Sequence, residues 1–156
     1  MNWDLLDFLI AAAMLAVLVG GGVALFRGRA HRACKLAGVG LLVANLLLFW
    51  INGAVGIIGA SGNDANLAYF LVPAIGLAGA ILQAVRGRGF ATACLASVVV
   101  LTVLASVALV MGWGRDGPAW PWDIVVITVF FVGVFVIVGV LHRHGERAHA
   151  AFSRSR

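Results

Sequence analysis

Long apolar runs separated by short polar gaps dominate this chain. A helix that crosses a bilayer needs about 20 mainly apolar residues, and five segments meet or approach that length. None of the five contains Asp, Glu, Lys, Arg or His, except for Asp7 near the start of the first. Backbone groups in lipid must be hydrogen-bonded within the protein, and the alternation of a barrel strand is absent, so helices are predicted. Their approximate ranges are 5–26, 36–58, 67–85, 90–112 and 124–141.

The charged residues support the third segment, 67–85, although it contains Pro73 and two glycines. With five spans, every Lys and Arg except Arg115 falls on one side of the membrane, and every acidic residue except Glu146 falls on the other. Without this span, basic loops would lie on both sides. The positive-inside rule then predicts an N-terminus outside and a C-terminus in the cytoplasm.

The two ends of the chain fit the same topology. The start, MNWDLLD, is acidic and lacks the basic region of a signal peptide, so the first span is expected to be an anchor. The segment 142–156 is expected to be an irregular, basic cytoplasmic tail. Indole rings prefer the membrane interface, and all but one of the tryptophans fall at the outer one: Trp3, Trp113, Trp120 and Trp122.

Composition excludes a soluble domain. Hydrophobic residues make up 63% of the 156 residues, only 11% are charged, and the mean hydropathy is +1.07. A soluble fold of this size buries only about 70% of the surface that its unfolded chain exposes. The net charge of +5 follows the predicted sides of the membrane, so the expected partner is the bilayer and not nucleic acid. The sequence therefore predicts an all-α, polytopic bundle in a single transmembrane domain, 1–156.

No residue pattern predicts an enzyme. The spans contain no histidine that could ligate haem and no charged residue at depth for a proton relay. Cys34 and Cys94 lack zinc-site spacing, and we interpret them as small hydrophobic residues. The usual zinc-protease, phosphate-loop and Ser/His/Asp motifs are missing. We therefore expect no catalytic residue, no cofactor and no metal site.

A polar stripe runs along the second span. Gly38, Asn45, Asn52 and Gly59 recur every seven residues and share one helical face, with Gly56 one turn beyond Asn52. An amide in hydrocarbon is costly unless it is hydrogen-bonded, so Asn45 and Asn52 are expected to face another helix. The stripe could serve helix packing or line a pore.

The third span offers a matching face. Gly76, Ala80, Gln83 and Gly87 are spaced so that they lie on one side of a helix. Small residues there would allow close approach of another helix. Pro73 is expected to kink this helix near the outer surface.

The outer hairpin, residues 59–69, joins these two spans. Asn63 or Asp64 is expected to cap the third helix, and the Asp64 carboxylate suits the positive end of the helix dipole. The same polar residues, with Asn66 and Tyr69, could instead bind a cation or a polar ligand.

Residues Trp50 to Gly59, followed by Asn63, Asn66-Leu67 and Tyr69, resemble a family of small, uncharacterised bacterial inner-membrane proteins. Its members carry a Trp-x-Asn…Val-Gly-Ile-Ile-Gly segment and an Asn-Leu-x-Tyr segment across one outer hairpin. The resemblance covers 45–86 and implies a multi-pass protein of the bacterial inner membrane. It draws attention to Asn52, Gly56, Asn63, Asn66 and Tyr69.

These observations lead to one expected function and two alternatives. We expect an accessory or scaffolding subunit of a larger membrane complex, or a homo-oligomer, because small-residue faces occur without any titratable group at depth. The first alternative is a channel for a small ion or neutral solute lined by Asn45, Asn52 and Gln83. The second is a small-ligand binder at the 59–69 hairpin.

Overall fold

The computed structural model describes residues 5–27, 32–59, 62–86 and 89–154, and this part of the chain contains helices and their connections but no strand. Five helices are long and apolar enough to cross a membrane, as the sequence predicts. The third of them, Asp64–Gln83, begins as a 3₁₀ helix, η1, and continues directly as an α-helix. The elements are α1 (Leu5–Arg27), α2 (Arg32–Ala54), η1 (Asp64–Phe70), α3 (Leu71–Arg86), α4 (Phe90–Met111) and α5 (Trp122–Arg154).

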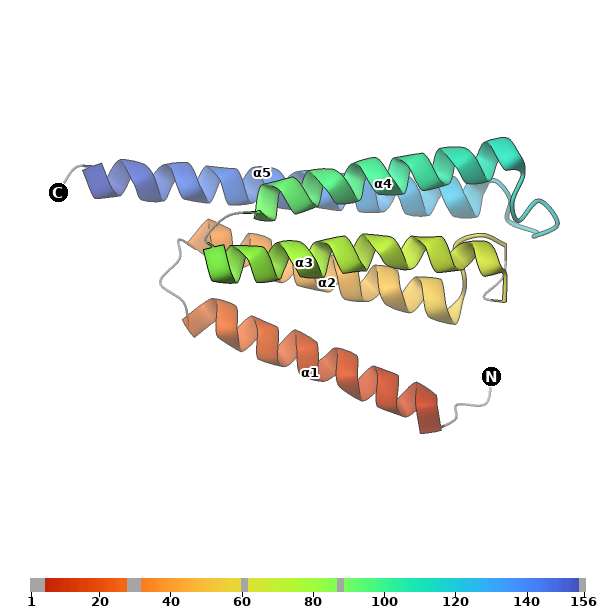
Figure 1. The fold of residues 1–156 in the computed structure, drawn as a ribbon, viewed down its shortest axis with the longest axis horizontal. Helices are drawn as coiled ribbons and strands as arrows, with labels where there is room; N and C mark the ends of the chain where they lie inside the picture. The colour runs from red at the N-terminus through yellow and green to blue at the C-terminus, as the bar shows by residue number, and fades with distance from the viewer. Residues whose placement is uncertain (1–4, 28–31, 60–61, 87–88, 155–156) are drawn as a thin grey trace.

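Four of the helices form a closed ring, and the fifth lies outside it. In the ring α2 packs on α3, α3 on α4 and α4 on α5, and α5 returns to α2. Helix α1 packs against α2 and is set apart on one side of the bundle (Figure 1). No residue in the apolar stretch of α1 is buried, whereas 28% to 33% of that stretch is buried in each ring helix. The ring is thus the core, and α1 is peripheral.

Glycines bring α3 close to both of its neighbours. A Cβ atom on Gly79 would collide with the Cβ of Ala93 in α4, and one on Gly76 would collide with the side-chain amide of Asn45 in α2. Lipid chains are as apolar as leucine, so helices in a membrane associate through close van der Waals contact, which small residues permit. The predicted match between the two faces is therefore confirmed at Gly76 and Asn45, and Gly87 of the predicted face is outside the described residues.

The remaining helix pairs meet in the same way. A Cβ on Gly40 would lie 2.9 Å from Val138 Cγ2, which joins α2 to α5, and one on Gly139 would lie 3.3 Å from Cys94 Cβ, which joins α5 to α4. Between α1 and α2 the contact is reciprocal. Leu42 of α2 lies over Gly21 of α1, and Leu25 of α1 lies over Gly38 of α2.

Two predicted boundaries differ from the structure. Helix α2 ends at Ala54 and not at 58, because Gly56 has a φ of +83° and reverses the chain there. Pro73 lies in the first turn of α3, directly after η1, so the expected kink coincides with the passage from the 3₁₀ helix to the α-helix and stays a prediction. Helix α5 continues to Arg154, so the expectation of an irregular tail from 142 is wrong. Alanine and long charged residues in this stretch favour a helix.

Gly79→Ala is expected to destabilise the protein by about 1–3 kcal/mol, because the new methyl group forces α3 and α4 apart. Gly133→Ala is the matched control, since a Cβ on Gly133 meets nothing within 4 Å. In the control, removing a helical glycine is expected to be neutral or stabilising by up to about 1 kcal/mol. Thermal unfolding in detergent, followed by circular dichroism, measures both. Equal stability of the two variants would contradict the proposed contact.

Candidate functional site

The polar residues singled out in the sequence gather mainly at one end of the bundle, which we call the tryptophan end. It consists of the hairpin from Val55 to Phe70 and the α4–α5 connection from Gly112 to Pro121. Trp113, Trp120 and Trp122 lie in or next to this connection, and Trp3 is outside the described residues. The guanidinium of Arg115 lies over the ring of Trp120, 5.4 Å from its centroid.

Asn66 organises the hairpin. Its Oδ1 accepts hydrogen bonds from the backbone N–H groups of Ile57, at 2.9 Å, and Ile58, at 2.8 Å. Its Nδ2 donates to the carbonyl oxygen of Ile58 at 3.4 Å. The side chain is only 3% exposed. A buried backbone N–H needs an acceptor, so this one amide replaces the helical bonds that Ile57 and Ile58 would otherwise make.

Asn52 ties the end of α2 to the same residue. Its Nδ2 donates to the backbone oxygen of Asn66 at 2.8 Å, and its side chain is 2% exposed. Asn52 therefore faces another helix, as the sequence analysis expected, and that helix is the 3₁₀ helix η1. Its Oδ1 accepts no hydrogen bond from the described residues. The bonds made by Asn52 and Asn66 fix the hairpin to α2.

Asn63 caps the element that follows, as one of the two candidates expected for that role. Its Oδ1 accepts from the N–H of Ala65 at 3.0 Å, and its own backbone oxygen accepts from Asn66 at 2.9 Å. Asp64 occupies the first turn of η1 and is exposed. Tyr69 is buried at the far end of η1. The helix that Asn63 caps is thus the 3₁₀ helix η1, and α3 begins only after η1 ends.

Three glycines hold the hairpin against the α4–α5 connection. Gly59 has a φ of +70° and Gly114 a φ of +78°, and both conformations favour glycine. A Cβ on Gly114 would lie 2.9 Å from the backbone nitrogen of Gly59, and one on Gly117 would lie 3.1 Å from Gly59 Cα. Backbone therefore packs directly on backbone where the two loops meet.

The structure does not bring Asn45, Asn52 and Gln83 together. Asn45 donates from Nδ2 to the carbonyl oxygen of Leu41, at 2.7 Å within its own helix, and packs on Gly76. Gln83 lies at the opposite end of α3 from η1, and its Oε1 accepts from the N–H of Phe90 at 3.4 Å. Each of the three amides thus serves a different contact at a different level of the bundle.

The opposite end of the bundle holds a cluster that the sequence analysis missed. We call this end of the bundle the basic end, because it carries Arg27, Arg32, Lys35, Arg86, Arg143 and Arg147. The cluster that was missed is centred on His142. His142 is 4% exposed, although the sequence analysis assigned it to the tail. Its ring stacks on Phe90 with centroids 4.1 Å apart, and its Nδ1 lies 3.7 Å from Glu146 Oε2. Its position four residues after the buried Val138 was the available signal.

Helix α2 joins this cluster through Cys34. The thiol donates to the carbonyl oxygen of His142 at 3.7 Å, and a Cβ on Gly145 would lie 2.9 Å from the Cys34 nitrogen. Cys34 and Cys94 are both free thiols. In the described part of the chain, no three His, Cys, Asp or Glu side chains are grouped so that they could hold a metal ion.

No protein-family model, no curated protein and no solved structure matches this chain. The geometry of its own residues must therefore carry the functional argument. Three features make up that geometry. Two loops pack on each other at the tryptophan end, His142 is buried against Phe90 at the basic end, and α1 lies at the periphery.

Asn66→Leu is expected to destabilise the protein by about 2–4 kcal/mol, because it leaves two buried N–H groups without an acceptor. The control is Asn63→Ala, which loses one partly exposed cap and is expected to cost about 1 kcal/mol. Chemical unfolding in mixed micelles, followed by tryptophan fluorescence, compares the two. The role of Asn66 is refuted if its replacement costs no more than that of Asn63.

Proposed function

We propose that this protein is an accessory or scaffolding subunit of the bacterial inner membrane, acting through α1 on another membrane protein or on a second copy of itself. One observation carries the proposal. Helix α1 is as apolar as the ring helices, yet none of its apolar stretch is buried. The four ring helices contact one another without α1. A function for the outer surface of α1 would explain why α1 is kept at the side of the ring.

The surface of α1 fits this role. Its contact with α2 uses Gly21 and Leu25. A second stripe, formed by Leu15, Val19 and Phe26, lies on a different face and is exposed. Such a stripe can pack on a partner helix while α2 holds α1 from the side.

The proposal does not include a pore, a ligand site or catalysis. A pore lined by Asn45, Asn52 and Gln83 has no support from their separate positions. At the hairpin, the side-chain amide of Asn66 is hydrogen-bonded to the backbone, and the side chain of Asn63 caps η1. The spans offer no charged residue at depth for acid–base chemistry. We therefore infer an activity based on assembly, without cofactor or metal.

We further propose that the tryptophan end faces the periplasm and the basic end faces the cytoplasm. The positive-inside rule supports this orientation, because the described Lys and Arg residues other than Arg115 all lie at the basic end. The resemblance of residues 45–86 to bacterial inner-membrane proteins supports the choice of membrane.

The orientation predicts which cysteines a membrane-impermeant maleimide can reach. In a variant with Cys34→Ala and Cys94→Ala, Asp116→Cys is expected to be labelled in intact spheroplasts. Arg147→Cys is expected to be labelled only after the membrane is permeabilised. Both positions are exposed, so accessibility within the fold does not bias the comparison. The reverse labelling pattern would show that the chain is inserted the other way round.

A photo-crosslinking residue at Leu15 in α1 is expected to give one discrete adduct, with a single protein or with a second copy of the chain. The control places the same residue at Val129 in α5, where the side chain is 67% exposed against 61% for Leu15. Val129 is expected to crosslink only to lipid. Mass spectrometry of the adducts from native membranes identifies the partner. Equal adduct patterns at both positions would rule out a special role for α1.

A further inference from the structure

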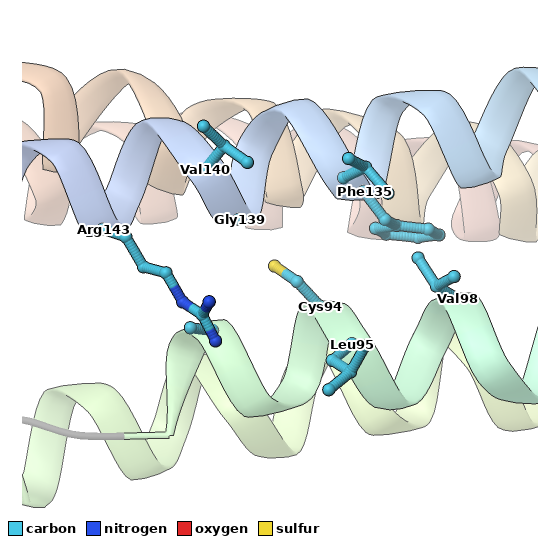
Figure 2. Close-up of a pocket in the computed structure, with 9 residues that line it drawn as sticks. Cys94, Leu95, Val98, Phe135, Gly139, Val140 and Arg143 are labelled. Atoms are coloured by element: carbon cyan, nitrogen blue, oxygen red, sulfur yellow. The ribbon is translucent and has the colours of Figure 1, made fainter.

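Two apolar grooves lie beside α4 at the basic end. The first runs between α4 and α5 and has a volume of about 200 Å³ (Figure 2). The second runs between α3 and α4 and has a volume of about 470 Å³. Side chains that line the first include Ala91, Leu95, Val98, Val136 and Val140. Those that line the second include Ile75, Ala78, Leu82, Thr92 and Ala96.

The grooves flank α4 on different sides. Ala91, Leu95 and Val98 are spaced at three and four residues and share one side of the helix. Thr92 and Ala96 are spaced at four residues and lie on another side. Between the two sides is an exposed ridge that includes Val99. A molecule with two flexible chains can therefore straddle the start of α4.

Each groove contains an arginine at its basic end. Arg143 of α5 belongs to the first groove, and Arg86 of α3 belongs to the second. Figure 2 shows the Arg143 side chain extending from α5 toward the first turn of α4. Both residues are exposed, and neither has a carboxylate partner among the described residues. The lining thus combines an apolar floor with a positive charge at one end.

The shape favours an acyl chain over a helix as the occupant. One turn of a helix about 10–12 Å across and 5.4 Å high occupies more space than the volume of the first groove, about 200 Å³. The small side chains Ala78, Ala91 and Ala96 leave room for a thin, flexible chain. Basic pockets between membrane helices bind anionic lipid headgroups. Such a headgroup would give the two arginines the negatively charged partner that they do not have among the described residues.

We propose that one anionic phospholipid binds across the start of α4, with its phosphate between Arg86 and Arg143 and an acyl chain in each groove. The lipid site rests on the location in a membrane proposed above, and it does not depend on the partner proposed for α1. An acyl chain gains no hydrophobic free energy when it moves from bulk lipid into a groove, because both are apolar. The preference for this lipid must therefore come from the headgroup charge, which makes the site selective for anionic over zwitterionic lipid.

Native mass spectrometry of the full chain in detergent tests the site. The probes are phosphatidylglycerol and phosphatidylcholine with the same acyl chains. The wild-type protein is expected to retain phosphatidylglycerol more tightly. Each arginine near an anionic headgroup contributes about fivefold in affinity, so the double variant Arg86→Gln/Arg143→Gln is expected to bind it about 30-fold more weakly. Equal retention of the two lipids by the wild type would overturn the proposal.

The matched control is Arg27→Gln/Arg147→Gln. It removes the same charge from the same end of the bundle, but neither residue lines a groove. Its affinity for phosphatidylglycerol is expected to stay within about twofold of wild type, since only general attraction is lost. Equal loss in both double variants would show that the lipid is held by net charge alone, which would refute a defined site.

A third double variant tests the grooves themselves. Ala78→Phe/Ala91→Phe fills both grooves and leaves the two arginines in place. Loss of phosphatidylglycerol binding is expected, and unchanged binding would show that the chains lie elsewhere. Circular dichroism shows whether each variant is folded. If the Ala78→Phe/Ala91→Phe variant is not folded, the two arginine double variants alone test whether the lipid binds at a defined site. Because lipid retention is measured on the protein alone, its result is independent of the α1 crosslinks.

Discussion

The structure depends on one constraint: apolar helices in lipid gain nothing from hiding apolar surface, so they hold together only where their atoms come very close. Every contact in the ring meets this requirement at a glycine. Gly76 and Gly79 bring α3 to its two neighbours, and Gly40 and Gly139 do so for α5. The bulky, fully buried residues of the core, such as Phe131 and Phe135, fill the space that these approaches define. The fold is thus specified by where side chains are missing as much as by where they are large.

A second constraint acts where the helices end, because backbone groups that leave a helix near the membrane still need partners. At the tryptophan end, the apolar stretch Val55 to Ile58 leaves the helix without exposing its N–H groups, since Asn66 supplies the acceptor. The backbone contact of Gly59 with Gly114 then covers the hairpin with the α4–α5 connection. At the basic end, Gln83 supports the start of α4. Two of the three amides that resemble a pore lining in the sequence, Asn52 and Gln83, thus make hydrogen bonds where helices begin or end.

The sequence was sufficient for the helices and insufficient for their ends. Apolar length is a local property, so the five spans could be located, and the seven-residue spacing correctly paired Asn45 with the α3 face. The end of α2 was missed because Val55, Ile57 and Ile58 are as apolar as the helix before them, and the features that end it are the conformation of Gly56 and the hydrogen bonds of the distant Asn66. His142 was missed because its charge type suggested a tail, while its burial depends on Phe90 from another helix. Long-range partners of this kind leave little trace in one sequence.

The length of α5 has a consequence for whatever lies beyond the bundle. Its 33 residues amount to about 50 Å of helix, well above the roughly 30 Å of a bilayer core. His142, Cys34 and Gly145 hold the helix against α2 where its apolar part ends, and the helix continues beyond this contact to Arg154. Its last dozen residues reach about 18 Å further. Beyond the apolar core of a bilayer, the charged residues after His142 are therefore carried in helical order, so Arg143 and Arg147 lie on one face of the helix.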